Sequence, residues 1–319
     1  MLILKQLFIS CIVTLLLILS GCFNEESTEE PKIDNDETYE SHEQPIAELE
    51  EVYTLGLYNK GDFEYERTFE IEHESFKRNI VLGNKTSKEG SFILLIFNHG
   101  EQMNFKVGDG KVSNNYRFDI KKEKYKDLEV TLLNLEDGFH SITYVLLNDP
   151  EEVPNDYETS MELADLFSIR VNLLKNIDNI PEERPNLFTE GIESEERRIH
   201  GAFLSKKEVP YETLYKEDMG EKEIPYTLFY GNSHSEKIDF YLVALLNYQQ
   251  TQLGTDDFLY DTLETDQEKS ISLDFNLPLK EESNSFQVLM IPTPFEPVSK
   301  EKTFLPQDPS ASNRVLILK

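Results

Sequence analysis

Ser91–Asn98, which reads SFILLIFN, decides the fold together with a second stretch, Phe240–Asn247, which reads FYLVALLN. Each is a short apolar run that ends at an asparagine, and such a run between turn residues is typical of a β-strand. Because the two stretches are alike, one structural unit is expected to occur twice in the chain. A Gly-Asn pair, which favours a turn, precedes each stretch, at Gly83-Asn84 and at Gly231-Asn232.

Three further pairs of segments repeat in the same order. The last pair is the clearest, because RVNLLK and RVLILK are identical at four of six positions. One such match arises by chance, but four in register point to an internal duplication. The three pairs are Asp127–Leu135 with Ser272–Leu279, Ser141–Leu147 with Ser285–Ile291, and Arg170–Lys175 with Arg314–Lys319.

The duplication predicts two related domains, residues 51–176 and residues 196–319. Residues 177–195 join them and contain two prolines and several acids, as expected of a linker. Each copy reads as short runs of β-branched, aliphatic and aromatic residues separated by turn residues, such as Asp109-Gly110. Amphipathic helices are scarce, and the best candidate is Tyr157–Leu166, expected to cover one end of a sheet. The pattern therefore predicts an all-β fold of two tandem β-sandwiches.

The segment Glu136–Ile142, EDGFHSI, indicates which kind of sandwich this is. It resembles the acid-x-Gly-x-Tyr-x-apolar corner of immunoglobulin-like domains, with His140 at the tyrosine position and Ile142 at the inward apolar position. The resemblance implies immunoglobulin-like sandwiches. It also implies that His140 bonds to the backbone at the corner instead of acting as a general base.

The N-terminus carries an export signal. A charged start precedes the apolar run from Leu7 to Leu19, and the next residues are Ser20, Gly21 and Cys22. This is the architecture of a signal peptide, residues 1–21, and the run is shorter than the roughly 20 apolar residues that a membrane-spanning helix needs.

Leu-Ser-Gly-Cys resembles the lipobox of bacterial lipoproteins of the Gram-positive type. The resemblance implies that Cys22 carries a diacylglyceryl group and becomes the new N-terminus. Two palmitate-sized chains would supply on the order of 20 kcal/mol of membrane affinity. Cys11 lies within the run that would be removed, so no disulfide is expected. An ordinary cleaved signal that ends near a cysteine is the alternative.

The net charge of −30 limits the classes of molecule that the protein is expected to bind. Nucleic acid is not expected, because its binding depends on basic groups, and peripheral attachment to anionic lipid is disfavoured for the same reason. Residues 22–50 are so acidic and so poor in apolar side chains that they are expected to form a disordered tether.

No catalytic motif is found. The six histidines are far apart in sequence, and neither a GxSxG elbow nor a phosphate-binding loop is present. Calcium is the one ionic hypothesis, because acidic side chains crowd two loops, although such loops are more often simply solvated. The candidate ligands are Asp149, Glu151, Glu152 and Asp156 in the first copy, and Asp256, Asp257 and Asp261 in the second.

The sequence therefore predicts a lipid-anchored protein on the extracytoplasmic face of the cell membrane. We expect a non-catalytic binding or scaffolding module without a cofactor, whose partner is a protein or an envelope component. Its contacts are expected at sandwich edges and at two end loops, Asn148–Tyr157 and Thr293–Ser312. Three other classes stay open: the solute-binding lipoprotein of a transporter, a β-sandwich hydrolase acting on cell-wall material, and a structural spacer.

Overall fold

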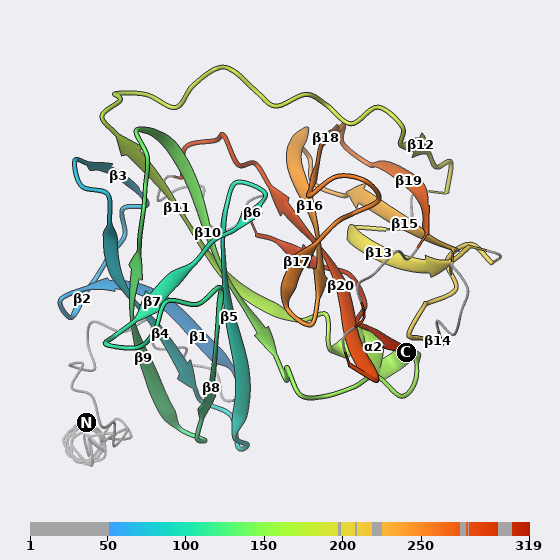
Figure 1. The fold of residues 1–319 in the computed structure, drawn as a ribbon, viewed down its shortest axis with the longest axis horizontal. Helices are drawn as coiled ribbons and strands as arrows, with labels where there is room; N and C mark the ends of the chain where they lie inside the picture. The colour runs from blue at the N-terminus through green and yellow to red at the C-terminus, as the bar shows by residue number, and fades with distance from the viewer. Residues whose placement is uncertain are drawn as a thin grey trace, which may run out of the picture. The chain divides into compact units, whose positions relative to one another are not determined.

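The computed structural model describes residues 51–196, 199–207, 209–218, 225–274, 279, 281–298 and 308–319. All of them belong to one compact unit, Asn35–Lys319. The predicted signal peptide, Cys22 and the predicted tether lie outside the described residues. Within the described part, strands dominate and one short helix occurs (Figure 1).

Residues 53–175 form two antiparallel sheets, apart from one parallel pair of strands. Sheet A has the order β2 (Asp62–Phe63), β1 (Tyr53–Asn59), β4 (Phe76–Asn84), β9 (Lys124–Leu132), β7 (Phe105–Val107). Sheet B has the order β3 (Thr68–Ile71), β11 (Leu166–Lys175), β10 (Gly138–Asn148), β5 (Gly90–Asn98), β6 (Glu101–Gln102), and β8 (Asn115–Ile120) also pairs with β5.

Residues 192–318 form a second pair of sheets. Sheet C has the order β12 (Ile192–Glu193), β19 (Gln267–Asp274), β15 (Pro225–Asn232), β13 (Gly201–Lys206). Sheet D has the order β14 (Lys216–Asp218), β22 (Val315–Leu318), β20 (Ser283–Pro292), β16 (Ile238–Leu246), β17 (Gln249–Thr251). Two more strands join sheet D, β18 (Leu259–Leu263) beside β16 and β21 (Ser310–Ala311) beside β20.

The two halves share one topology. In each half, an early strand joins the first sheet, β1 in sheet A and β13 in sheet C. A short strand that follows pairs in parallel with the last strand of that half, β3 with β11 and β14 with β22. Both halves are immunoglobulin-like sandwiches, so the predicted all-β fold is confirmed.

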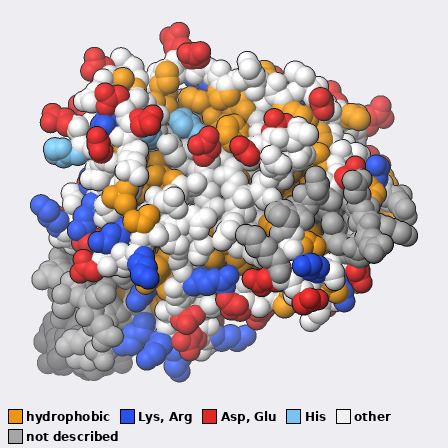
Figure 2. Space-filling view, viewed as in Figure 1, with side chains coloured by type: hydrophobic (Ala, Val, Ile, Leu, Met, Phe, Trp, Pro, Cys, Tyr) orange, Lys and Arg blue, Asp and Glu red, His pale blue; other side chains and the backbone are white. Residues whose placement is uncertain are grey.

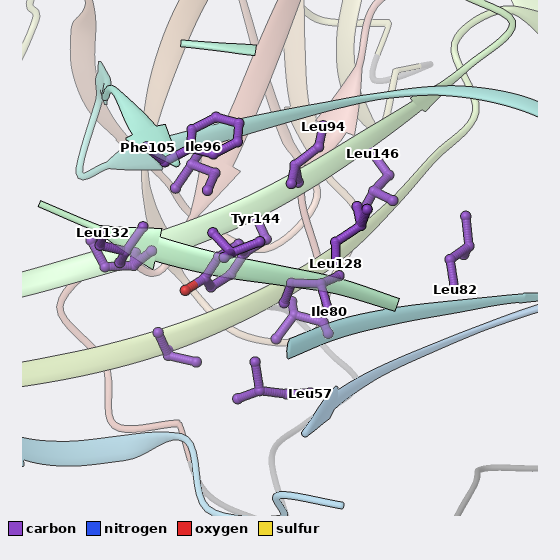
Figure 3. Close-up of a cluster of buried hydrophobic side chains, with 14 of the residues drawn as sticks. Leu57, Ile80, Leu82, Leu94, Ile96, Phe105, Leu128, Leu132, Tyr144 and Leu146 are labelled. Carbon is purple, nitrogen blue, oxygen red and sulfur yellow. The ribbon is translucent and has the colours of Figure 1, made fainter. Parts of the chain in front are cut away.

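Three apolar cores hold the four sheets together. One fills the space between sheets A and B (Figure 3), and a second lies between sheets C and D. The third consists of side chains from sheets B and D, so the two sandwiches pack against each other through these sheets. We call this third core and the polar contacts around it the seam.

The seam explains why strands β5 and β16 are continuous apolar runs in the sequence. Along β5, Phe92, Leu94 and Ile96 point into the core between sheets A and B, while Ile93, Leu95 and Phe97 point into the seam. Because both faces are buried, the strand carries no polar alternation. Strand β16 follows the same rule.

The directions in which the side chains of β5 and β16 point also correct the alignment of the two repeats. Phe240, Leu242 and Ala244 point into the core of their own sandwich, so Phe240 corresponds to Phe92 and not to Ser91. The sequence match of Ser91 with Phe240 is wrong by one residue, a shift that would exchange the two faces of the strand. An uninterrupted apolar run gives no signal that fixes this register.

The two Gly-Asn pairs end strands β4 and β15 and are not turns. Asn84 is buried, and its amide donates to the backbone oxygens of Lys88 (2.8 Å) and Ile120 (3.2 Å). Asn232 makes the equivalent bonds to Glu236 (2.8 Å) and Leu263 (3.3 Å). Each asparagine thus ties a hairpin loop to the neighbouring strand, the same device in both copies.

The predicted corner is confirmed. The Nε2 atom of His140 lies 2.8 Å from the backbone oxygen of Glu136, and Ile142 is fully buried. The helix is shorter than predicted: α2 (Tyr157–Glu162) is capped by Asp156, and Met161 is 43% exposed instead of covering a sheet.

The segment between β11 and β12 runs as extended chain past both sheet pairs (Figure 1). Its final residues, Ile192 and Glu193, pair with β19 and so join sheet C. Phe188 donates its backbone N–H to the Tyr260 backbone oxygen at 2.7 Å, so the segment is also bonded to sheet D.

Candidate functional site

The seam is built on an approximate two-fold relation between the sandwiches. Gln102 and Gln250 show it best, because each backbone N–H donates to the side-chain oxygen of the other, at 2.6 and 2.7 Å. Each side-chain amide then donates to the opposite half, to the backbone oxygen of Tyr248 or of Gly100. Such reciprocal contacts are the mark of an isologous interface, here formed within one chain.

Two arginines repeat this relation at the ends of the seam. Arg170, within β11, and Arg314, directly before β22, occupy equivalent positions and are 6% and 0% exposed. The Arg314 guanidinium donates to the backbone oxygens of Asn148 (2.9 Å), Asp149 (2.6 Å) and Glu152 (3.2 Å).

Arg170 binds the equivalent loop of the other sandwich. Its guanidinium donates to the backbone oxygens of Pro292 (3.2 Å), Thr293 and Glu296, and to the Thr293 hydroxyl (2.8 Å). Asp149 and Thr293 both have positive φ, 46° and 48°, which turns their carbonyls toward these arginines. Each sandwich therefore fixes an end loop of its partner.

Burial affects the charge of both arginines. Desolvation lowers the pKa of Arg170 to about 10, and the carboxylates of Glu296 and Asp239 partly offset that effect. Desolvation also lowers the pKa of Arg314, opposed by Tyr248 and Asp149. Both groups stay charged at neutral pH, and their carbonyl partners replace the water that burial removes.

The end loops predicted as contact sites lie at these arginines. The backbone of Asn148–Tyr157 is held by Arg314, and the start of Thr293–Ser312 is held by Arg170. Residues 299–307 of the second loop lie outside the described residues. The predicted loops are thus part of the seam, a role that the sequence analysis missed.

The proposed calcium ligands are used in separate interactions. Asp156 caps α2, and the backbone N–H of Thr159 lowers its pKa. Glu151 pairs with Arg117, while burial raises the pKa of Asp149. Glu152 offers its backbone oxygen to Arg314 at 3.2 Å.

In the second copy, Asp261 is buried and bonded to Lys269 (2.9 Å) and to the Tyr230 hydroxyl (3.2 Å). Asp257 accepts a bond from Gln250 through its backbone oxygen, and Asp256 pairs with Leu253 through backbone bonds. Across the residues that the structure describes, no three His, Cys, Asp or Glu side chains come together as a metal site would require.

His99 lies at the margin of the seam. Its ring stacks on Phe295 with centroids 5.1 Å apart, and its Nε2 atom is 3.2 Å from the Phe139 backbone oxygen. Burial is the main reason that the pKa of His99 is lowered to about 4; the bond to the Phe139 backbone oxygen opposes it, and the charges of His140 and Arg170 assist it. The ring is therefore neutral at pH 7. Asn247 is the counterpart of His99 in the second half. Both have positive φ, 55° at His99 and 51° at Asn247, and each donates its backbone N–H to a serine backbone oxygen at 2.8 Å, Ser141 for His99 and Ser285 for Asn247.

The loop held by Arg314 and the helix α2 that follows it expose apolar side chains. Val153, Tyr157 and Met161 are 48%, 58% and 43% exposed, and they lie within nine consecutive residues. Tyr157 and Met161 are one helical turn apart on α2. We call these three side chains the apolar patch. On the face seen in Figure 2, hydrophobic side chains also gather near the upper edge, and others lie among acidic and basic ones.

The described helix is far too short to cross a membrane, and none of the described residues forms a longer apolar helix. No protein-family model and no curated protein sequence matches the chain.

Several solved structures show a distant likeness. Red sea bream transglutaminase is 9% identical over 84% of this chain, with a TM-score of 0.23, and the match spans only 31% of the transglutaminase. A chaperone–tip adhesion subunit complex of Acinetobacter baumannii Csu pili is 12% identical over 83% of this chain and 100% of that one, with a TM-score of 0.27. The periplasmic chaperone SfaE is 10% identical over 84% and 99%, with a TM-score of 0.23. At such scores these proteins carry no argument about function.

Replacing Arg314 by methionine should destabilise the protein strongly. The substitution leaves three partly buried carbonyl bonds without their donor and removes a fully buried guanidinium, so we expect the free energy of unfolding to fall by about 3 kcal/mol. Lys77→Met is the control, because Lys77 forms an exposed pair with Glu129 and should change stability by less than about 0.5 kcal/mol. Urea denaturation measures both. Equal effects would show that Arg314 does not hold the seam.

His99 should make stability depend on pH. Between about pH 6.5 and pH 4 the unfolded chain binds a proton at His99 that the folded protein excludes, so the free energy of unfolding decreases as the pH falls. The loss should reach about 2–3 kcal/mol. His99→Asn, the residue of the equivalent position, should lose less stability between pH 7 and pH 4.5 than the unaltered protein. His73, which is exposed, provides the control in His73→Asn, and an unchanged slope in His99→Asn would contradict the assignment.

Proposed function

We propose that the protein is a lipid-anchored, extracytoplasmic binding module that contacts a protein or an envelope component through the apolar patch. The observation that carries the binding role is the patch itself: three exposed apolar side chains, one on the loop whose backbone the buried Arg314 holds and two on α2 directly after it. Contiguous exposed apolar patches on soluble proteins mark interaction sites. Leu19-Ser20-Gly21-Cys22 supports the anchored location.

The seam favours this proposal over a transporter's solute-binding protein. Such proteins close two lobes around a ligand at a hinge, whereas here the space between the halves is filled by side chains such as Leu95, Val243 and Leu289, all fully buried. Binding on the surface of one rigid body fits the fold better than binding between moving lobes.

Anchoring is tested with Cys22→Ala. Without the sulfur no thioether to lipid forms, so the protein should leave the membrane fraction or accumulate with its signal peptide attached. Cys11→Ala is the matched control and should stay in the membrane fraction, because Cys11 lies inside the apolar run. Fractionation with immunoblotting measures both. A Cys22→Ala protein that remains processed and membrane-bound would contradict lipid attachment.

Binding is tested by crosslinking on intact cells. A photoreactive residue at Tyr157 should capture a discrete partner, and Val153→Asp with Met161→Asp should abolish that capture by placing charges in the contact. The control places the probe at Val112, which is 56% exposed in the β7–β8 loop. The same products from both positions would contradict a specific patch.

A further inference from the structure

One end of the seam contains buried polar atoms without partners. In the described part of the structure the unpartnered atoms include Asn98 Oδ1 and His99 Nδ1, and four that belong to the most deeply buried residues of this region: the Ser141 and Thr143 hydroxyls, the Arg170 Nε atom and the Asn172 Oδ1 atom. All four residues are at least nine-tenths buried. Such orphaned atoms are rare in proteins, because each costs the free energy of its lost hydration.

These four side chains share one small region. Ser141 is the cross-strand partner of Asn172, and Thr143 is the partner of Arg170. Their neighbours Ile142 and Tyr144 point into the core between sheets A and B, so residues 141 and 143 point into the seam. Side chains that are directly opposite on one face have Cβ atoms about 5 Å apart. The four side chains therefore lie on one small area of the sheet face, and Arg170 and Asn172 both donate to the Glu296 backbone oxygen there.

The second sandwich fills the equivalent region with its own side chain. Gln287 stands where the first half has Thr143, and its Oε1 atom accepts from the Arg314 Nε atom at 3.4 Å. Its Nε2 atom donates to the backbone oxygens of Leu163 and Ser312, both at 3.1 Å. The longer glutamine thus satisfies its arginine, whereas threonine is too short to do the same for Arg170.

The chemistry of the four atoms defines the ligand. The Arg170 Nε–H group donates, Asn172 Oδ1 accepts, and the two hydroxyls do either. An anion gains little there, because the carboxylates of Glu296 and Asp239 already act on the Arg170 charge. A cation is repelled by the guanidinium. The ligand must be small, neutral, and both donor and acceptor.

We propose that this end of the seam is a binding site for ordered water, about one or two molecules, bonded to Thr143, Arg170 and Asn172. Water performs here the task that the Gln287 side chain performs in the second sandwich. The two ends of the seam therefore differ: the Arg314 end is closed by protein groups, and the Arg170 end is hydrated.

The test is a pair of exchanged residues in crystals of the whole chain. The unaltered protein should show a water peak within hydrogen-bond distance of Thr143 Oγ1, Arg170 Nε and Asn172 Oδ1. Thr143→Gln should remove the peak and raise the melting temperature by about 2 °C. The reciprocal change, Gln287→Thr, should create a water peak beside Arg314 and lower the melting temperature.

Three outcomes would overturn the proposal. One is a map of the unaltered protein without a peak, with both hydroxyls bonded to backbone oxygens instead. Another is density too large for water. If Thr143→Gln does not fold, Thr143→Val replaces it, since valine keeps the shape and removes one partner of the water. An unchanged peak in Thr143→Val is the third such outcome.

Discussion

The burial of sheets B and D against each other is the constraint on which the rest of the structure depends. Once both sheets are covered on two faces, their central strands must be apolar throughout, as β5 and β16 are. Carbonyl groups at the ends of such an interface lose water and need donors inside the protein. Arg170 and Arg314 supply those donors. Their burial is tolerated because each guanidinium bonds to several acceptors.

A duplicated chain that packs on itself in this way resembles a two-fold dimer in its energetics. Equivalent residues of the two copies make the same contact in both directions, as the reciprocal hydrogen bonds of Gln102 and Gln250 show. Because the two copies are parts of one chain, however, their sequences need not be identical. Thr143 and Gln287 have diverged at one position, and His99 and Asn247 at another, so the ends of the seam differ in polarity and in their response to acid.

Much of the fold could be predicted from the sequence, because strand runs, turn residues and the corner at His140 are local signals. The repeat was visible for the same reason, and RVNLLK with RVLILK even placed the two arginines in register. The seam could not be predicted, because an apolar run does not say how many of its faces are covered. The one-residue error between Ser91 and Phe92 has this origin. The roles of Asp149 and Glu152 depend on Arg314, more than 100 positions away, and composition alone does not identify that partner.

The seam also determines what the exposed loop can contribute to binding. A loop that must be ordered on contact loses part of its binding free energy to that ordering. Here Arg314 holds the backbone at Asn148, Asp149 and Glu152, and Ser160 on α2 bonds to the Arg314 backbone oxygen at 2.6 Å. Val153 and Tyr157 lie between these fixed points. Their side chains are therefore presented on a backbone that is already ordered, and the packing of one sandwich sets the geometry of the surface offered by the other.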